Sequence, residues 1–217
     1  MAALDHVLVV GATGLVGSEA LRQLSADARV GGITALVRRD LPGELRLPKI
    51  EQRVVDFDAL DRLDGLLAAS HVLCALGTTI RQAGSRERFR QVDHDYVVAT
   101  GRLGLRLGAR HFLLVSALGA DARSRVFYNR VKGETEAGVR ALGYPSVTIA
   151  RPSLLLGHRR ERRLGEEIAK RLGFLMPGRL RPVQAADVAR ALVGAAVEDR
   201  PGVRIIESDE IRRQGRA

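Results

Sequence analysis

Short apolar runs rich in β-branched residues alternate with segments of helical periodicity along this 217-residue chain, and this alternation constrains its fold most strongly. The runs are apolar at every position, which is typical of strands buried on both faces of a sheet. Such strands, separated by amphipathic helices, form parallel sheets with a helical layer on each side. The predicted fold class is therefore α/β, with a doubly wound parallel sheet. We predict strands at residues 7–10, 33–37, 50–55, 71–76, 112–115, 147–150 and 203–206.

The segments between these strands place apolar residues three or four apart, which is the period of an amphipathic helix. The predicted helices lie around residues 15–24, 58–67, 89–103, 128–142 and 183–197. Asp58 is a plausible N-terminal cap for the second helix. We see no internal repeat and no low-complexity linker, so 1–217 is predicted to be one domain. The domain is predicted to end in a short C-terminal appendage on the substrate side of the sheet. Within it, the arginine-rich stretch 157–182 is predicted to be an insertion.

Composition excludes several classes of protein. Apolar residues make up 46% of the chain and charged residues 28%, which excludes a disordered or fibrous chain. One cysteine, Cys74, excludes an intrachain disulfide and a metal site built from cysteines. No run approaches the roughly 18 apolar residues of a membrane-spanning helix. No secretory signal is visible at the start, so a cytoplasmic protein is expected.

The chain is strongly basic, with 35 Lys and Arg against 25 Asp and Glu and a formal net charge of +10. Aromatic residues make up only 4% and tryptophan is absent, so the stacking platforms of single-strand nucleic-acid binders are missing. The charge therefore favours an anionic small ligand, and a nucleic-acid partner is not expected. A basic cluster at 158–163 could contact an anionic substrate, with a solvated surface as the alternative.

A glycine-rich turn follows the first predicted strand and opens the first helix, reading Gly11-Ala12-Thr13-Gly14-Leu15-Val16-Gly17. Glycine permits a tight turn and lets the backbone approach a pyrophosphate, which the N–H groups and dipole of the helix N-terminus then bind. The spacing Gly-x-x-Gly-x-x-Gly differs from the Gly-x-Gly-x-x-Gly of many dehydrogenases, but its position between strand and helix is the required one. The turn predicts a Rossmann-like fold that binds a dinucleotide cofactor through Gly11, Thr13, Gly14, Leu15 and Val16.

Residues at the ends of the next two strands bear on which dinucleotide is bound. Arg38 and Arg39 end the second strand, where NAD-dependent proteins usually carry an acidic residue and arginine accommodates a 2′-phosphate. We therefore expect NADP(H) in preference to NAD(H), with solvated arginines as the alternative. Asp56 and Phe57 follow the third strand and are well placed to meet the adenine ring; Asp56 could instead cap a helix.

Tyr128 and Lys132 lie four residues apart on a predicted helix and so share one of its faces. A tyrosine pKa of about 10 is too high for proton transfer at neutral pH, and a nearby ammonium group lowers it. Tyr128 could then give a proton to a carbonyl oxygen as a hydride arrives, or remove one in the reverse direction. A surface pair without catalytic role is the alternative.

Several stretches together resemble the atypical short-chain dehydrogenase/reductase group, and more closely the Tat-interacting-protein oxidoreductases and their bacterial relatives. The most specific are Leu76-Gly77-Thr78-Thr79 and Val92-Asp93-His94-Asp95-Tyr96. The others lie at 10–17, 54–58, 116–121, 128–136 and 151–152, so that the resemblance covers about residues 6–157.

The resemblance implies roles for residues that the pattern alone does not assign. Leu76, Gly77 and Thr78 would lie along the centre of the cofactor, and Ser116 would lie beside its nicotinamide. Tyr128 would be the proton donor, and Lys132 would activate it and contact the nicotinamide ribose. Pro152 and Ser153 would border the carboxamide.

One departure from the family pattern concerns the residues after the fifth strand. Reductases of this superfamily usually place Ser or Thr there to hydrogen-bond the substrate oxygen, whereas Ala117 and Leu118 follow Ser116 here. Three alternatives stay open: Ser116 serves both cofactor and substrate, Ser124 approaches the site, or the polar partner is missing.

The leading hypothesis is an NADP(H)-dependent oxidoreductase that acts on a small carbonyl or alcohol compound through Tyr128, Lys132 and Ser116. A non-catalytic NADP(H) sensor that acts through a protein partner is the first alternative, and an epimerase or dehydratase of nucleotide sugars is a weaker one. A homo-oligomer is compatible with each. No metal is expected: Asp93, His94 and Asp95 are adjacent and cannot all face one ion. His6, His71 and His111 precede strands at the opposite end of the sheet, and we interpret them as structural.

Overall fold

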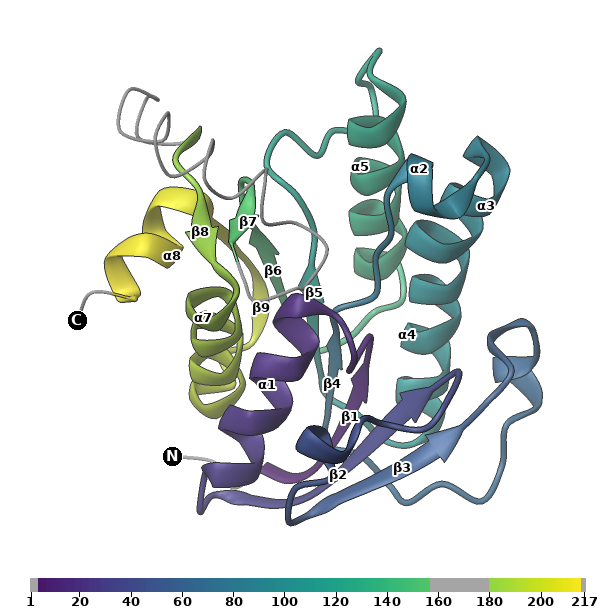
Figure 1. Ribbon diagram of the computed structural model, residues 1–217, viewed down its shortest axis with the longest axis vertical. Helices are drawn as coiled ribbons and strands as arrows, with labels where there is room; N and C mark the ends of the chain where they lie inside the picture. The colour runs from purple at the N-terminus through teal and green to yellow at the C-terminus, as the bar shows by residue number, and fades with distance from the viewer. Residues whose placement is uncertain (1–3, 157–179, 216–217) are drawn as a thin grey trace.

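The computed structural model describes residues 4–156 and 180–215, and its centre is a parallel sheet of seven strands (Figure 1). The strand order is β3-β2-β1-β4-β5-β6-β9, which confirms the predicted doubly wound α/β fold. Chain order reverses between β1 and β4, which is where ligands bind in such sheets. The strands are β1 Leu4–Val10, β2 Val30–Val37, β3 Ile50–Val54, β4 His71–Cys74, β5 His111–Val115, β6 Ser146–Arg151 and β9 Gly202–Glu207.

Helices cover both faces of the sheet, as Figure 1 shows. On one face lie α1 (Leu15–Ala26) and α7 (Ala185–Glu198), and on the other lie α4 (Tyr96–Arg106) and α5 (Phe127–Arg140). Successive residues of β1 point to opposite layers: Val7 and Val9 join the core beneath α1 and α7, and Leu8 and Val10 join the other. Because both faces are buried, the strands need apolar residues at every position, which is the pattern seen in the sequence.

Shorter elements fill the connections. The 3₁₀ helix η1 (Gly43–Leu45) lies between β2 and β3, and the 3₁₀ helix η2 (Phe57–Arg62) lies between β3 and β4. Between β4 and α4 lie α2 (Ile80–Ala83), α3 (Arg86–Arg90) and a π-helical turn, η3 (Gln91–Asp95), and α8 (Ser208–Gln214) ends the described chain. Two strands of two residues each, β7 (Leu155–Leu156) and β8 (Val183–Gln184), form a separate parallel pair.

Three predictions about these connections were wrong. The helix expected at 58–67 is the shorter η2, and Asp56 rather than Asp58 caps it, because the Asp56 carboxylate accepts from the Asp58 N–H at 3.0 Å. The helix expected at 183–197 begins at Ala185, because Val183 and Gln184 pair as β8 with β7. The sequence also predicts a mobile basic tail at 212–216, but residues 212–214 belong to α8, whose Ile211 is buried. Most of the predicted insertion, and the basic cluster 158–163, lies outside the described residues.

Candidate functional site

The chain passes from β1 into α1 through a turn that only glycine can form. Gly11 has φ +80°, and a Cβ on it would lie 2.4 Å from the carbonyl carbon of Ala75. A Cβ on Gly17 would lie 2.1 Å from the carbonyl oxygen of Gly11. Gly14 begins the helix with its N–H donating to the Gly11 carbonyl at 2.9 Å, and no described side chain caps this end. The N-terminus of α1 therefore keeps backbone N–H groups and its positive dipole end for a ligand.

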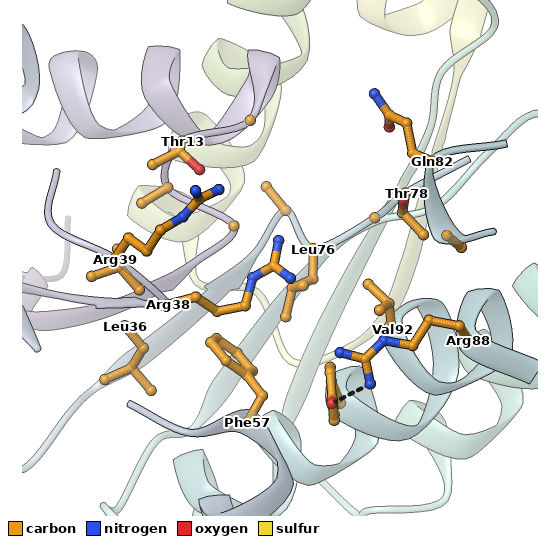
Figure 2. A pocket seen from close by; sticks show the side chains of 18 of the residues that line it. Thr13, Leu36, Arg38, Arg39, Phe57, Leu76, Thr78, Gln82, Arg88 and Val92 are labelled. Atoms are coloured by element: carbon orange, nitrogen blue, oxygen red, sulfur yellow. Dashed lines mark hydrogen bonds between the residues drawn. The ribbon is translucent and has the colours of Figure 1, made fainter. Parts of the chain in front are cut away.

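A cavity of about 750 Å³ opens beside this turn, at the carboxyl ends of β1, β2 and β4 (Figure 2). Its volume lies within the range of small-molecule and cofactor sites. Many of the residues predicted to bind the cofactor line it together, although they come from four separate stretches of sequence. These are Gly11, Thr13, Gly14, Arg38, Arg39, Phe57, Leu76, Gly77 and Thr78.

Arg38 and Arg39 contribute positive charge to this cavity. Both side chains are exposed, and neither forms an ion pair or a hydrogen bond with another described residue. In Figure 2, Arg38 extends into the cavity beside Phe57, and Arg39 points toward Thr13. Asp40 does not neutralise them, because its carboxylate accepts from Gln52 at 3.1 Å and lies 3.8 Å from Arg46. The cavity thus presents two cations that have no partner in the part of the chain that the structure describes.

Asp56 and Phe57 are adjacent in the sequence but differ in their relation to the cavity. The Asp56 carboxylate caps η2 and does not line the cavity, so the capping alternative describes its position. Phe57 lines the cavity, and its ring packs against Tyr96 at a centroid distance of 5.5 Å.

Two cavity residues, Arg88 and Tyr96, escaped sequence reasoning. Arg88 Nη1 donates to the Tyr96 hydroxyl at 3.1 Å, and this hydroxyl donates to Asp58 at 2.7 Å. The Arg88 guanidinium also lies over the Tyr96 ring, 5.7 Å from its centroid. In the sequence Tyr96 belongs to a stretch that carries the family resemblance but has no assigned role, and an arginine among so many gave no separate signal.

Lys132 forms a buried ion pair with Asp93, whose carboxylate lies 2.7 Å from the ammonium group. The second oxygen of Asp93 accepts from the Thr78 N–H at 2.8 Å, which joins the pair to the loop after β4. Burial by itself lowers the pKa of Lys132, but the charges of Asp93 and Tyr128 outweigh it and the pKa is raised. The pair borders Gly77, where a Cβ would lie 3.6 Å from the ammonium nitrogen. Sequence reasoning considered Asp93 only as a metal ligand and missed this contact.

Tyr128 lies one turn before Lys132 on α5 and is half-buried. Its ring packs against Phe89 at a centroid distance of 5.5 Å, and its hydroxyl makes no hydrogen bond to a described residue. The predicted pair thus shares a helix face, with the ammonium group held in the interior and the phenol at the edge of the protein.

Ser116 points into the protein interior. Its hydroxyl donates to the buried carboxylate of Glu136 at 2.6 Å. Glu136 is also paired with Arg151 at 2.6 Å and Arg140 at 2.9 Å. The Ser124 hydroxyl oxygen accepts from the Val126 N–H at 3.2 Å, which leaves its hydrogen to donate. Of the three alternatives for a substrate-oxygen partner, the arrangement disfavours the first, because the Ser116 hydroxyl donates to Glu136.

The remaining predicted cofactor residues do not line the cavity. Val16 is buried in the core, and Leu15 packs against the same cluster. After β6, Ser153 donates to the Arg181 carbonyl at 2.5 Å and accepts from the Ser208 hydroxyl at 2.9 Å. Pro152 accepts from the Leu118 N–H at 2.8 Å. In this structure these residues hold loops and helices together.

No protein-family model matches the chain, but curated relatives do. Protein HTATIP2 of Rattus norvegicus is 36% identical over 173 residues, which are 79% of this chain and 71% of the relative. The mitochondrial protein FMP52 of Eremothecium gossypii is 34% identical over 216 residues, 95% of each chain. The sequence relationship therefore extends over most of the molecule.

Solved structures also resemble the chain. MoeE5 in complex with UDP-glucuronic acid and NAD has a TM-score of 0.75 at 19% identity, over 94% of this chain and 76% of that one. At this identity the match shows the fold alone, and it confirms the Rossmann-like architecture.

The fungal relatives correct the expected location. FMP52 proteins of Eremothecium gossypii, Emericella nidulans and Candida albicans are named as mitochondrial. The expectation of a cytoplasmic protein was therefore wrong on this comparison, because these names point to mitochondria instead. Within residues 4–156 and 180–215, no helix combines the length and the apolar character needed to cross a bilayer.

Proposed function

The chain belongs to the atypical short-chain dehydrogenase/reductase family, with the NAD(P)-binding Rossmann fold of HTATIP2 and FMP52, and from this premise we propose that it is an NADP(H)-dependent oxidoreductase. The observation that carries the proposal is the pair of uncompensated cations, Arg38 and Arg39, at the cavity beside the glycine turn. Guanidinium groups bind phosphate through paired, charge-assisted hydrogen bonds, so this pair suits a 2′-phosphate better than a free ribose hydroxyl.

The cavity fits such a cofactor in chemical terms. The open N-terminus of α1 suits the pyrophosphate. Phe57 offers an aromatic face for the adenine. When bound, the nicotinamide supplies or accepts a hydride.

Tyr128 and Lys132 are the residues to which we assign the proton transfer that accompanies this hydride. The Tyr128 hydroxyl would donate a proton to the oxygen of a small carbonyl compound, and the Lys132 ammonium would stabilise the phenolate left behind. Asp93 holds Lys132 in place beside Gly77. The substrate is then a small carbonyl or alcohol.

Calorimetric titration with NADPH and NADH tests the cofactor assignment. We expect NADPH to bind on the order of tenfold or more tighter than NADH, and Arg38→Ala with Arg39→Ala to remove most of that difference. Arg22→Ala is the matched control, because Arg22 is a surface arginine of α1 outside the cavity. Equal affinity for the two cofactors, or unchanged preference in the double variant, contradicts the proposal.

A second candidate is a non-catalytic NADP(H) sensor, and the state of Ser116 favours it. The hydroxyl of Ser116 is committed to Glu136, and Ala117 offers no replacement for holding a substrate oxygen. Tyr128→Phe separates the candidates. In the oxidoreductase it abolishes NADPH oxidation by carbonyl compounds while cofactor binding persists, whereas the sensor has no turnover to lose.

The weaker candidate is an enzyme acting on nucleotide sugars, because MoeE5 holds UDP-glucuronic acid and NAD on the same fold. Such enzymes retain their cofactor through purification. Release of NAD on denaturing the purified protein, together with binding of UDP-glucuronic acid, would favour this candidate over the oxidoreductase.

A further inference from the structure

A cluster of three potential metal ligands lies at the edge of the sheet opposite the cavity. His71 and His111 are the first residues of β4 and β5 and are direct neighbours in the sheet. Asp199 follows α7 with φ +44°, a left-handed conformation that is rare for residues other than glycine. One oxygen of its carboxylate, Oδ1, lies 3.4 Å from His71 Nε2 and 3.1 Å from His111 Nδ1.

The contacts of Ser70 allow two tautomers of His71. The Ser70 hydroxyl can donate to the carbonyl of His6, 3.0 Å away, or to His71 Nδ1, 2.8 Å away. When it donates to His6, Ser70 Oγ accepts from His71 Nδ1. In that arrangement Nδ1 carries the hydrogen of the neutral ring, and Nε2 carries a lone pair.

That lone pair faces a carboxylate oxygen. His71 is fully buried, and its Nε2 has no hydrogen-bond partner among the described residues. Two lone pairs 3.4 Å apart repel each other unless a cation lies between them.

We propose that His71 Nε2, His111 Nδ1 and Asp199 Oδ1 bind a divalent metal ion, with zinc as the best match. Two imidazoles and a carboxylate are a common zinc ligand set. Zinc–ligand bonds of 2.0–2.1 Å in tetrahedral geometry separate neighbouring ligand atoms by about 3.3 Å. The separations of Asp199 Oδ1 from the two nitrogens, 3.1 and 3.4 Å, match that value. The three ligand atoms lie within 4.8 Å of one another, a wider limit that the two nitrogens must close to about 3.3 Å when they bind one ion.

The groups behind the ligands have the arrangement that metal sites require. Ser70 Oγ lies beside the far nitrogen of His71, and Thr148 Oγ1 lies 2.9 Å from the far nitrogen of His111. Such partners orient the ring and hold it in the correct tautomer. Arg110 donates to the other oxygen of Asp199 at 2.6 Å and leaves Oδ1 for the metal. The Arg110 side chain is 40% exposed, so water weakens its repulsion of the ion.

The site would be structural. It joins the loop between α7 and β9 to the starts of β4 and β5, far along the strands from the glycine turn. The metal would tie segments more than 80 residues apart in sequence, as the contacts of His111 and Arg110 with Asp199 already do. The proposed metal site does not depend on the cofactor cavity, so its test is independent of the proposed activity.

The test begins with untagged full-length protein, stripped of metal by a chelator and titrated with ZnCl₂ and separately with CoCl₂. We expect one zinc per chain, a rise in the unfolding temperature, and an intense visible absorption of cobalt that indicates tetrahedral coordination. His111→Gln and Asp199→Asn should each weaken zinc binding by at least about tenfold. His94→Gln is the matched control, since His94 is a histidine of the same chain outside the cluster.

Two outcomes overturn the proposal. One is zinc binding that is absent in the wild-type protein or unaffected by the His111 and Asp199 substitutions. The other is a metal-free network in which the Nε2 hydrogen of His71 is bonded to Asp199 and to the nearby Ala196 carbonyl. Long-range ¹H–¹⁵N spectra of the wild-type histidine rings identify that tautomer directly, so the result does not depend on whether a variant folds.

Discussion

Lys132 and Asp93 form an ion pair of 2.7 Å in which the lysine side chain is 8% exposed and the aspartate side chain is not exposed at all. The lysine that we propose activates Tyr128 is therefore already neutralised by a partner within the protein. The pair also connects α5 to the loop after β4 through the Thr78 N–H. Both charged groups lie next to Gly77, which lines the cavity.

Replacing Asp93 by asparagine should destabilise the fold substantially. The change leaves the Lys132 charge buried without a partner, which costs about 3–5 kcal/mol. Urea denaturation of Asp93→Asn measures the loss. Asp95→Asn is the control, because Asp95 is 56% exposed and pairs with His94 at the surface, so its loss should be about 1 kcal/mol or less. Equal effects of the two substitutions would contradict the role given to the buried pair.

Gly11→Ala should damage both the fold and the cavity. The added Cβ would lie 2.4 Å from the Ala75 carbonyl carbon. The alanine must also adopt a positive φ, which alone costs about 1–2 kcal/mol. We expect a lower unfolding temperature and loss of NADPH binding by calorimetry. Gly194→Ala provides the comparison, because nothing lies within 4 Å of its Cβ in α7. Alanine should stabilise that helix by about 0.5–1 kcal/mol.

Ser116→Ala should affect stability more than ligand binding. The hydroxyl donates to the buried Glu136 carboxylate, and hydrogen bonds to charged groups contribute about 1.5–3 kcal/mol. We expect a loss of that size in chemical denaturation and unchanged affinity for NADPH. A large fall in NADPH affinity with unchanged stability would instead place the Ser116 hydroxyl at the cofactor.

Cys74 should be unreactive in the folded protein. The thiol is fully buried in β4, and burial raises its pKa to about 12, so the reactive thiolate is scarce at neutral pH. A thiol-specific reagent should label the chain only after denaturation. Rapid labelling without denaturant would show that β4 opens far more readily than the packed sheet implies.

Sequence reasoning located the parts of the cofactor cavity because each lies at a strand end that the sequence pattern can identify. Gly11, Arg38 and Phe57 follow β1, β2 and β3, and parallel strands bring their carboxyl ends to one edge. It did not find Asp93, because the residue's contact with Lys132 depends on the π-helical turn η3 and on how α5 packs beside it. Likewise, nothing in the spacing predicted that Ser116 would donate to Glu136.

The amino-acid sequence by itself determined the parallel sheet, its two helical layers and the glycine turn, because these depend on periodicity and on backbone freedom at single residues. Only the tertiary structure decided which charges meet. Lys132 with Asp93 and His111 with Asp199 are contacts between elements far apart in the chain. Such pairs depend on side-chain direction and burial at the junction of several elements, and local sequence patterns carry no information about either.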